Sequence, residues 1–403
     1  MRELRPIALE EGPGFLAQIL RTFYGQAGSA EEIEARLRLL ELDRALGVFE
    51  DGELVATAGT HSMRLTVPGG LAVPAAAIYG VTVLPTHRRQ GLLTALVRRQ
   101  LDDARSRGEP VAILHASEGA IYGRFGYGVA SYLANLKVER SRSAFARPLA
   151  ASGLRYVSPA EALEVIPGLA ERLAAGQPGM ITRSAAWWRM QLEEGPADRA
   201  RKQVVLHEGS EGPDGFAVYR RDVQWLEANP AGSLHLSQLQ AEDAPAYAAL
   251  WRHCLDVDLM QSVVAPARRV DEPLRHLLAD PRALVASLAD QLWLRLVDLE
   301  AALASRRYRV EGRLRLLVED AFCDRNSGVY ELSGGPAGAR CAAATGEPDL
   351  VLSAAALAAC YLGGNTFAAL TAAGLVAERR AGAAELADAM FASSPAPWCA
   401  YHF

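Results

Sequence analysis

Apolar residues recur at two spacings along the first third of the chain. Spacings of three and four residues predict helices over 13–24, 30–42 and 91–107. Short apolar runs predict strands over 46–49, 54–63, 75–84, 111–115 and 129–138. The Asp51-Gly52 pair between the first two strands favours a hairpin turn. Residues 1–142 are therefore expected to form one mixed α/β domain.

The rest of the chain shows the same mixture in two further blocks. In the first block the pattern predicts helices over 160–175, 184–192 and 244–255, and strands over 203–206 and 215–220. In the second block it predicts strands over 292–297, 312–319, 329–332 and 349–353, and helices over 299–306, 354–362 and 383–391. A chain of 403 residues exceeds one ordinary core, so we expect three domains, 1–142, 143–283 and 284–403.

Composition narrows the class of protein. A net charge of -5 argues against a surface that binds nucleic acid. No uncharged stretch reaches membrane-spanning length and the first residues lack a signal-peptide pattern, so the expected compartment is the cytoplasm. The five cysteines are scattered without CxxC spacing, so neither a disulfide framework nor a metal site is expected.

The most informative segment joins an apolar strand to a helix through a basic turn that contains glycine. Its residues are Val81, Thr82, Val83, Leu84, Pro85, Thr86, His87, Arg88, Arg89, Gln90, Gly91, Leu92, Leu93 and Thr94. Backbone N–H groups at a helix N-terminus bind anions, and Gly91 lets a phosphate come close to the backbone. Arg88 and Arg89 add positive charge. The segment therefore predicts a pyrophosphate site, although it is neither a Walker A loop nor a GxGxxG turn.

The same turn matches the Arg-x-x-Gly-x-Gly/Ala signature of GNAT acetyltransferases, except that Leu93 replaces the last small residue. A second segment, Ala-Ser-Glu-Gly-Ala-Ile-Tyr-Gly-Arg-Phe-Gly-Tyr at 116–127, lies one helix downstream. Together the two segments resemble the Eis (enhanced intracellular survival) family in particular. Residues 292–303 and 349–364 are similar to the sterol-carrier-like domain of that family, and the chain ends on Phe403 as its members do.

This resemblance implies an α/β (α+β) fold with two tandem GNAT-like domains, the second lacking a cofactor site, and then a sterol-carrier-like domain whose C-terminus enters the active site. It implies acetyl-CoA as the acetyl donor, no metal, and a homohexamer. It places the cofactor between strands at 78–84 and 111–116 that splay apart, with Ser117 and Glu118 beside it. Ser117 is also well placed to cap a helix that would carry Tyr122.

Acetyl transfer to an amine needs a polarised carbonyl, an acceptor for the amine proton and a donor for the leaving thiolate. The resemblance assigns the carbonyl to the backbone N–H of Val81 and the donor to Tyr122, with Tyr127 as the internal alternative. The motifs offer no well-placed side-chain base. The α-carboxylate of Phe403, on an apolar and Pro-rich tail, is therefore the expected base. The alternative is a tail that docks only for stability.

Three residues are candidates for the acceptor side of the site, namely Phe23, Asp290 and His402. His402 is the penultimate residue, where an acidic side chain would bind a polycation better. For Asp290 the alternative is a structural role in a turn. The acidic run over 31–43 is either a solvated helix face or a rim that attracts amines. Structural roles are expected for His87, Trp187 and Trp188. His253 and Cys254 are adjacent on a helix and so do not face each other as a nucleophile pair.

We therefore expect an acetyl-CoA-dependent N-acetyltransferase that acts on primary amines of a multi-amine small molecule, similar to an aminoglycoside or polyamine, or on lysine. Two other functions stay open. One is a lipid- or sterol-binding carrier in which the GNAT domains are scaffold, and the other is a regulator that binds acetyl-CoA without turnover.

Overall fold

The computed structural model describes residues 2–149, 153–192 and 202–403, and the chain forms two compact units. Unit 1 comprises Met1–Ser131, Pro178–Thr182 and Gln291–Phe403, and unit 2 comprises Tyr132–Gln177 and Arg183–Asp290. Unit 1 holds a seven-stranded and a five-stranded sheet, and unit 2 holds a second seven-stranded sheet. Within the described ranges no helix combines the length and the hydropathy that crossing a membrane requires.

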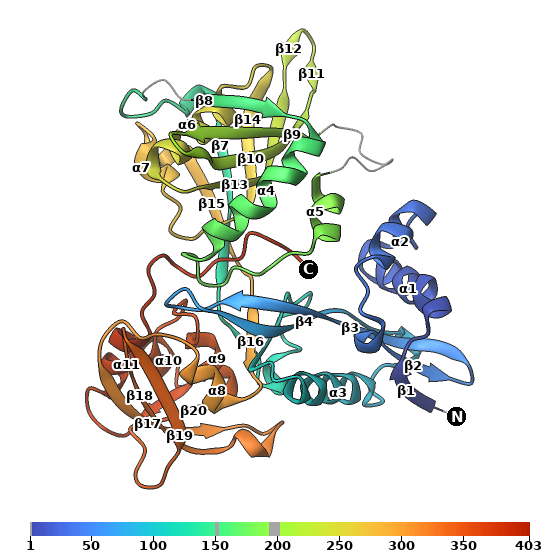
Figure 1. Cartoon of the computed structure of the whole chain (residues 1–403), viewed down its shortest axis with the longest axis vertical. Helices are drawn as coiled ribbons and strands as arrows, with labels where there is room; N and C mark the ends of the chain where they lie inside the picture. Colours follow the sequence, from blue (N-terminus) through green and yellow to red (C-terminus); the bar gives the residue numbers. More distant parts are fainter. Residues whose placement is uncertain (1, 150–152, 193–201) are drawn as a thin grey trace. The chain divides into compact units, whose positions relative to one another are not determined.

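The larger sheet of unit 1 has the strand order β1-β2-β3-β4-β5-β16-β6 (Figure 1). Its strands are β1 (Arg2–Pro6), β2 (Leu46–Glu50), β3 (Glu53–Thr66), β4 (Ala72–Val83), β5 (Val111–Leu114), β6 (Gly128–Val129) and β16 (Trp293–Leu296). The predicted hairpin turn is confirmed, because Asp51 and Gly52 both have the positive φ that a type I′ turn needs. Only β4 and β5 pair in parallel in this sheet.

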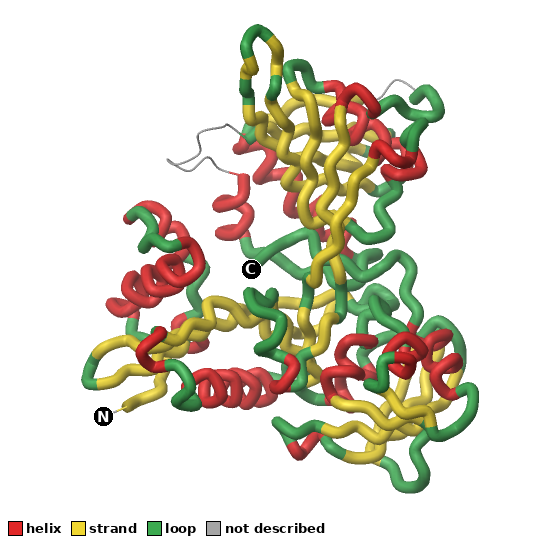
Figure 2. The backbone as a smooth tube through the Cα atoms, turned by 180° about the vertical axis from the view of Figure 1, so that it is seen from behind, coloured by secondary structure: helices red, strands yellow, loops and turns green. Residues whose placement is uncertain are grey.

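Three helices cover this sheet, namely α1 (Gly12–Tyr24), α2 (Ala30–Leu37) and α3 (Leu92–Ser106). Figures 1 and 2 show α3 on one side of β3 and β4 and the α1–α2 pair on the other. The buried face of α3 is the predicted apolar stripe, with Leu92, Leu96, Val97, Leu101 and Ala104. The helix predicted over 30–42 ends at Leu37 and is followed by a short 3₁₀ turn, Leu42–Arg44.

The smaller sheet of unit 1 has the order β19-β18-β17-β20-β21. Its elements are β17 (Gly312–Glu319), β18 (Gly328–Gly335), β19 (Gly338–Ala343), β20 (Leu350–Ser353), β21 (Val376–Glu378), α8 (Leu299–Ala304), α9 (Ala354–Cys360), α10 (Phe367–Ala372) and α11 (Ala383–Phe391). Buried Arg306 lies over the rings of Tyr308 and Phe391, at 4.7 and 4.6 Å. It also donates hydrogen bonds to the carbonyls of Tyr361 and Phe391, so large side chains fill this interior.

The sheet of unit 2 has the order β15-β7-β14-β13-β10-β9-β8, and β13 and β14 are its parallel pair. Its elements are β7 (Tyr132–Glu139), β8 (Gly153–Val157), β9 (Gln203–Gly209), β10 (Gly212–Asp222), β13 (Gly232–Ala241), β14 (Met260–Arg268), β15 (Leu284–Asp290), α4 (Pro159–Ala174), α5 (Ala185–Leu192), α6 (Ala244–Asp256) and α7 (Leu274–Leu277). A two-stranded ribbon, β11 (Trp225–Leu226) and β12 (Asn229–Pro230), extends from it. One parallel pair inside an otherwise antiparallel sheet repeats the arrangement of the larger sheet in unit 1.

The strand predicted over 129–138 is confirmed for most of its residues, but its continuity is wrong, because the segment divides into two strands that join different sheets. β6 pairs with β16 in the first sheet, whereas β7 pairs with β14 and β15 in the second. Between them, Ala130 and Ser131 donate backbone hydrogen bonds to Leu292, which precedes β16. A continuous apolar run does not show where a chain changes sheets, since this depends on a pairing partner far away in the sequence.

Candidate active site

The parallel strands β4 and β5 part near the middle of the larger sheet in unit 1. They pair only from Ala75 opposite Val111 to Ile78 opposite Leu114. β5 then ends, while β4 continues to Val83. On its other edge β4 has a bulge, where the register with β3 skips Gly80 and Val81. The segment after Ile78 therefore has an unpaired edge facing the end of β5, as the splayed-strand expectation requires.

The predicted phosphate turn follows β4 directly. It passes through the 3₁₀ turn Pro85–His87 and enters α3 at Gly91, which has a φ of 81°. A Cβ at Gly91 would meet no atom within 4 Å, so the helix start is open on that side. The side chains of Arg88 and Arg89 are exposed and make no hydrogen bond or ion pair to any described residue. Two positive charges and the first N–H groups of α3 thus stand together.

The other residues predicted in this turn have varied surroundings. Thr82 is buried, and its hydroxyl lies 2.7 Å from that of Thr57, so its side chain is engaged inside the sheet. Gln90 accepts a 2.6 Å hydrogen bond from Arg2. His87 pairs with Glu50 at 3.0 Å, which agrees with a structural role in the loop. The side chains of Leu92 and Leu93 pack into the sheet side of α3, and Thr94 is exposed.

The helix expected after Ser117 is wrong. The chain forms turns there, followed by the 3₁₀ segment Gly123–Phe125, and Ser117 and Glu118 are exposed and cap no helix. Glycines at 119, 123 and 126 explain the difference, because glycine disfavours helix and Gly126 adopts a φ of 79°. The carbonyl of Tyr122 accepts backbone hydrogen bonds from Phe125 and Tyr127, at 3.0 and 3.3 Å. We refer to residues 122–127 as the Tyr122 turn.

Tyr122 packs where the two strands part. Its side chain belongs to one apolar cluster with Ile78 and Leu114, the last paired residues of β4 and β5, and Val81 packs against that cluster. Burial, and to a smaller extent the charge of Glu118, raises the pKa of Tyr122 to about 12. The ring of Tyr127 lies 5.9 Å from that of Tyr122. Its hydroxyl is fully enclosed and finds no hydrogen-bond partner among the described residues.

The C-terminal residues lie against the residue that follows β5. The ring of His115 is 4.1 Å from that of His402 and 4.7 Å from that of Phe403, measured between centroids. The tail before them is anchored, because Trp398 donates a 2.8 Å backbone hydrogen bond to Pro178 and Cys399 donates one to Gln291. His115 was not predicted from the sequence, and its place directly after a buried strand was the one signal available.

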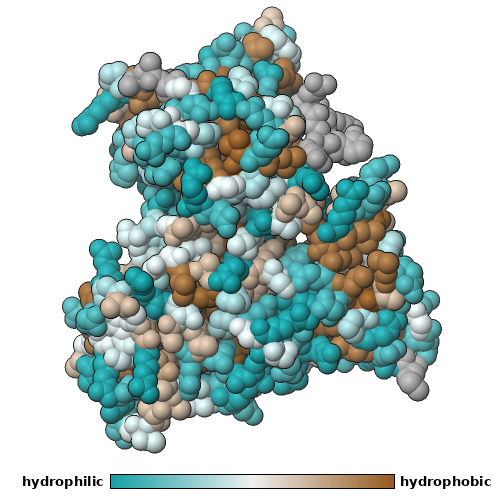
Figure 3. All heavy atoms as spheres, viewed as in Figure 1, coloured by the Kyte–Doolittle hydropathy of each residue, from teal (hydrophilic) through white to brown (hydrophobic). Residues whose placement is uncertain are grey.

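The remaining acceptor-side candidates are on two other elements. Phe23 is on α1 and 42 % exposed, where apolar side chains gather over α1 and α2 in Figure 3. Asp290 ends β15 in unit 2. Most of the acidic residues over 31–43 pair with arginines, as in Glu32–Arg36 and Asp43–Arg107, so this run is a solvated surface network.

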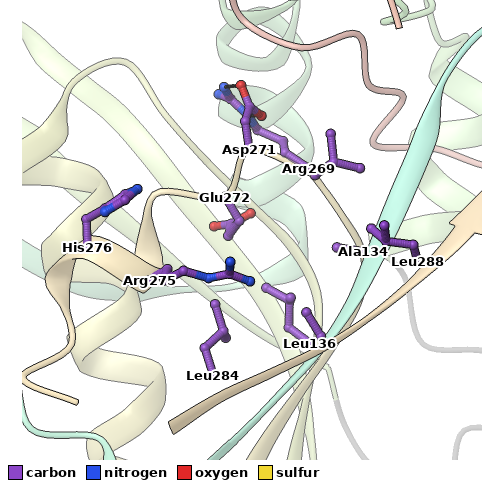
Figure 4. A pocket seen from close by; sticks show the side chains of 11 residues that line it. Ala134, Leu136, Arg269, Asp271, Glu272, Arg275, His276, Leu284 and Leu288 are labelled. Atoms are coloured by element: carbon purple, nitrogen blue, oxygen red, sulfur yellow. Dashed lines mark hydrogen bonds and ion pairs between the residues drawn. The ribbon is translucent and has the colours of Figure 1, made fainter. Parts of the chain in front are cut away.

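Unit 2 contains a cavity of about 380 Å³, and no residue of β4 or β5 lines it (Figure 4). Its floor is apolar, with Leu136 and Leu284, and some of the charged groups beside it are paired. Arg269 binds Asp271 at 2.8 Å, and Glu272 accepts from buried Arg268 at 3.1 Å. No group of three or more potential metal ligands occurs in the parts of the chain that the structure describes.

Four residues of unit 2 that the sequence assigns no catalytic role are Trp187, Trp188, His253 and Cys254. Trp187 and Trp188 are both buried and their rings meet edge to face, with centroids 5.0 Å apart, which confirms packing. His253 contacts the hydroxyl of Tyr219 at 2.9 Å, whereas burial raises the pKa of the Cys254 thiol to about 12. His253 therefore bonds a tyrosine and not its neighbour, which agrees with the helix geometry.

Both seven-stranded sheets contain one parallel pair, and in unit 1 this pair parts above a basic helix start. Two such sheets followed by a third domain define a tandem GNAT acetyltransferase. Family profiles agree with this class. The acetyltransferase (GNAT) domain matches residues 3–130 and again 179–306, and the sterol carrier protein domain matches 299–400. The predicted fold class is thus confirmed, and the protein is an acyltransferase.

Full-length relatives identify the family. The N-acetyltransferase Eis of Mycobacterium tuberculosis is 34% identical over 98% of both chains. An uncharacterized N-acetyltransferase of Streptomyces avermitilis is 42% identical over 96% of this chain and 95% of that protein. The crystal structure of Eis1 from Mycobacterium abscessus superposes with a TM-score of 0.89 at 37% identity, covering 100% of both chains. The chain belongs to the Eis family of GNAT N-acetyltransferases.

Proposed function

We propose that this enzyme transfers the acetyl group of acetyl-CoA directly to a primary amine of a multi-amine small molecule, such as an aminoglycoside or polyamine, or of lysine. The observation that carries the proposal is the convergence of three groups at the end of β5. Tyr122 shares one apolar cluster with Ile78 and Leu114, and Val81 packs against that cluster. The ring of Phe403 lies against that of His115, which follows β5.

The donor is held by the turn between β4 and α3. Arg88 and Arg89, with the N–H groups at Gly91 and Leu92, bind the pyrophosphate as a charged and directional site. The pantetheine arm enters between the parted strands, and the thioester oxygen accepts a hydrogen bond from the N–H of Val81. Val81 lies at the bulge of β4, where the regular register with β3 is interrupted. A fixed donor aimed at the oxygen stabilises the charge that develops there.

The amine nitrogen attacks the carbonyl carbon, the N–C bond forms and the C–S bond breaks. The carboxylate of Phe403 takes the amine proton, directly or through water, because an α-carboxylate is ionised at neutral pH. The hydroxyl of Tyr122 donates to the leaving sulfur. A phenol is a weaker acid than a thiol in water, so this donor acts first as a hydrogen bond and gives up its proton as thiolate charge develops in a buried site.

The carrier alternative is weakened by the interior of the sterol-carrier-like domain. Arg306, Tyr308, Tyr361, Phe367 and Phe391 are all nearly inaccessible there and pack on one another. A lipid-binding domain needs an apolar cavity instead. By the same family resemblance, we propose a cytoplasmic homohexamer with domains at 1–142, 143–283 and 284–403.

The direct test is acceptor-dependent thiol release from acetyl-CoA. We expect release only when a polyamine, an aminoglycoside or a lysine peptide is present, with a mass increase of one acetyl group on that acceptor. Binding of acetyl-CoA without transfer to any amine would favour the regulator. Apolar lipid retained through purification, without transfer, would favour the carrier.

A further inference from the structure

A buried arginine lies directly under the Tyr122 turn. Nη1 of Arg295, on β16, donates a hydrogen bond to the carbonyl of Phe125. Arg295 is completely inaccessible to solvent. A Cβ added to Gly126 would lie 1.5 Å from the same Nη1, so the guanidinium occupies the space that a side chain of the turn would take. The position of Arg295 therefore fixes the position of the turn.

The sterol-carrier-like domain holds this arginine. Nη2 of Arg295 pairs with Asp320, the residue after β17, and both side chains are 1% exposed. The other carboxylate oxygen of Asp320 accepts backbone hydrogen bonds from Phe322 and Cys323, at 3.2 and 3.0 Å. A buried guanidinium needs such a partner, since an uncompensated buried charge is strongly unfavourable. Asp320 is thus the anchor that keeps Arg295 in place.

The loop over 320–326 makes a second contact with the cofactor side of the site. The ring of Phe322 meets that of Phe125 edge to face, at 5.0 Å between centroids. On α3, the guanidinium of Arg98 lies 4.5 Å from the centroid of the Phe322 ring. One loop of the third domain therefore touches both the Tyr122 turn and the helix that begins at the phosphate site.

We propose that the Arg295–Asp320 pair is a positioning element, through which the sterol-carrier-like domain sets the place of Tyr122 relative to the thioester. This inference rests on the proposed function, in which Tyr122 donates to the leaving thiolate. It gives the third domain a defined part in catalysis without any ligand of its own. Arg295 and Asp320 touch neither substrate, and they act only through the turn.

The kinetic test uses Asp320→Asn in the full-length enzyme. We expect kcat to fall by about tenfold or more, since a misplacement of about 1 Å is costly, with the acetyl-CoA Kd unchanged. In a Tyr122→Phe background the same substitution should cause no further loss in kcat, because its effect passes through the Tyr122 hydroxyl. Equal losses in both backgrounds would overturn the proposal. Arg325→Ala is the matched control, since it removes a half-exposed pair with Asp102 from the same loop and should leave kcat unchanged.

A spectroscopic test reports on the turn independently of turnover. The enzyme is labelled with 3-fluorotyrosine, and the ¹⁹F resonance of Tyr122 is assigned by its loss in Tyr122→Phe. Asp320→Asn should shift this resonance and Arg325→Ala should not. Arg295→Lys, which keeps the charge but not the forked geometry, should also shift it. An unshifted resonance in folded Asp320→Asn would refute the positioning role. A Tyr122→Phe variant with normal kcat would instead refute the acid assignment alone.

Discussion

Phe403 lies with its ring centroid 4.7 Å from that of His115, the residue that follows β5. The last residue of the chain is thereby placed at the point where β4 and β5 part. A carboxylate at this position can take a proton from an amine that approaches a thioester held between the strands.

The first prediction follows from that placement. Deletion of Phe403, or extension of the chain by a short tag after it, should abolish acetyl transfer while acetyl-CoA binding and folding persist. Deletion moves the carboxylate away, and a tag converts it to an uncharged amide. Activity is measured by thiol release and binding by calorimetry. The same tag at the N-terminus should be harmless.

Phe403→Leu separates the carboxylate from the aromatic ring, because it keeps the charge and removes the contact with His115. We expect this variant to retain much more activity than the deletion. Full activity in a C-terminally tagged protein would rule out the terminal base.

The second prediction concerns the donor to the thiolate. Tyr122→Phe should lower kcat by about 100-fold or more and leave the acetyl-CoA Kd intact, the usual scale for losing a general acid. The phenyl ring still fills the apolar cluster with Ile78 and Leu114, so folding should not change. If turnover stays near that of the parent enzyme, water or Tyr127 must supply the proton.

The third prediction concerns the phosphate turn. Arg88→Ala and Arg89→Ala should each weaken acetyl-CoA binding by about 1–3 kcal/mol, the scale of a charge-assisted hydrogen bond. Gly91→Val should be more severe, because a β-branched residue is strained at a φ of 81° and its side chain faces the phosphate. Arg105→Ala, near the far end of α3, is the control and should bind normally. A variant that combines all three substitutions and still binds acetyl-CoA with the parent affinity in calorimetry would exclude this turn as the cofactor site.

Local sequence patterns predicted the elements that follow from nearby residues. They did not predict the features that depend on packing and pairing with distant residues. The strand, basic turn and helix over 75–107 follow from apolar spacing and one glycine, which are local properties. The segment after Ser117 was mistaken for a helix because its capping signal competes with three glycines, and one of these, Gly126, packs on Arg295. The insertion of β16 between β5 and β6, and the contact of the tail with His115, depend on pairings remote in sequence.

The fourth prediction concerns stability. Arg44 and Glu109 form a bidentate ion pair, with N–O distances of 2.7 and 2.6 Å and side chains 0% and 6% exposed. Glu109→Gln should lower the free energy of unfolding by about 2 kcal/mol, because the buried guanidinium loses its most buried counter-charge and keeps only the more exposed Asp103. Denaturant titration measures this. Asp43→Asn removes the exposed pair with Arg107 and should cost less than about 1 kcal/mol. Equal effects of the two substitutions would contradict the burial argument.

The last prediction is the pH dependence of kcat. Burial raises the pKa of Tyr122 to about 12, so the hydroxyl stays protonated well above neutral pH. Loss of the acid should therefore cause no fall in kcat up to about pH 10.5, whereas an unperturbed phenol, with a pKa of about 10, would lose activity there.

On the acidic side, kcat should fall as the amine and then the terminal carboxylate become protonated. The measurement is thiol release at saturating acetyl-CoA and amine from pH 6 to 10.5, with circular dichroism to confirm folding at each pH. Glu118→Gln tests whether burial or the charge of Glu118 is the main cause of the raised pKa of Tyr122. Its charge is the smaller contribution to the shift and burial is the larger one, so this variant should keep the same alkaline plateau. A fall in kcat centred near pH 9 in the folded parent enzyme would contradict a buried, protonated Tyr122 as the donor.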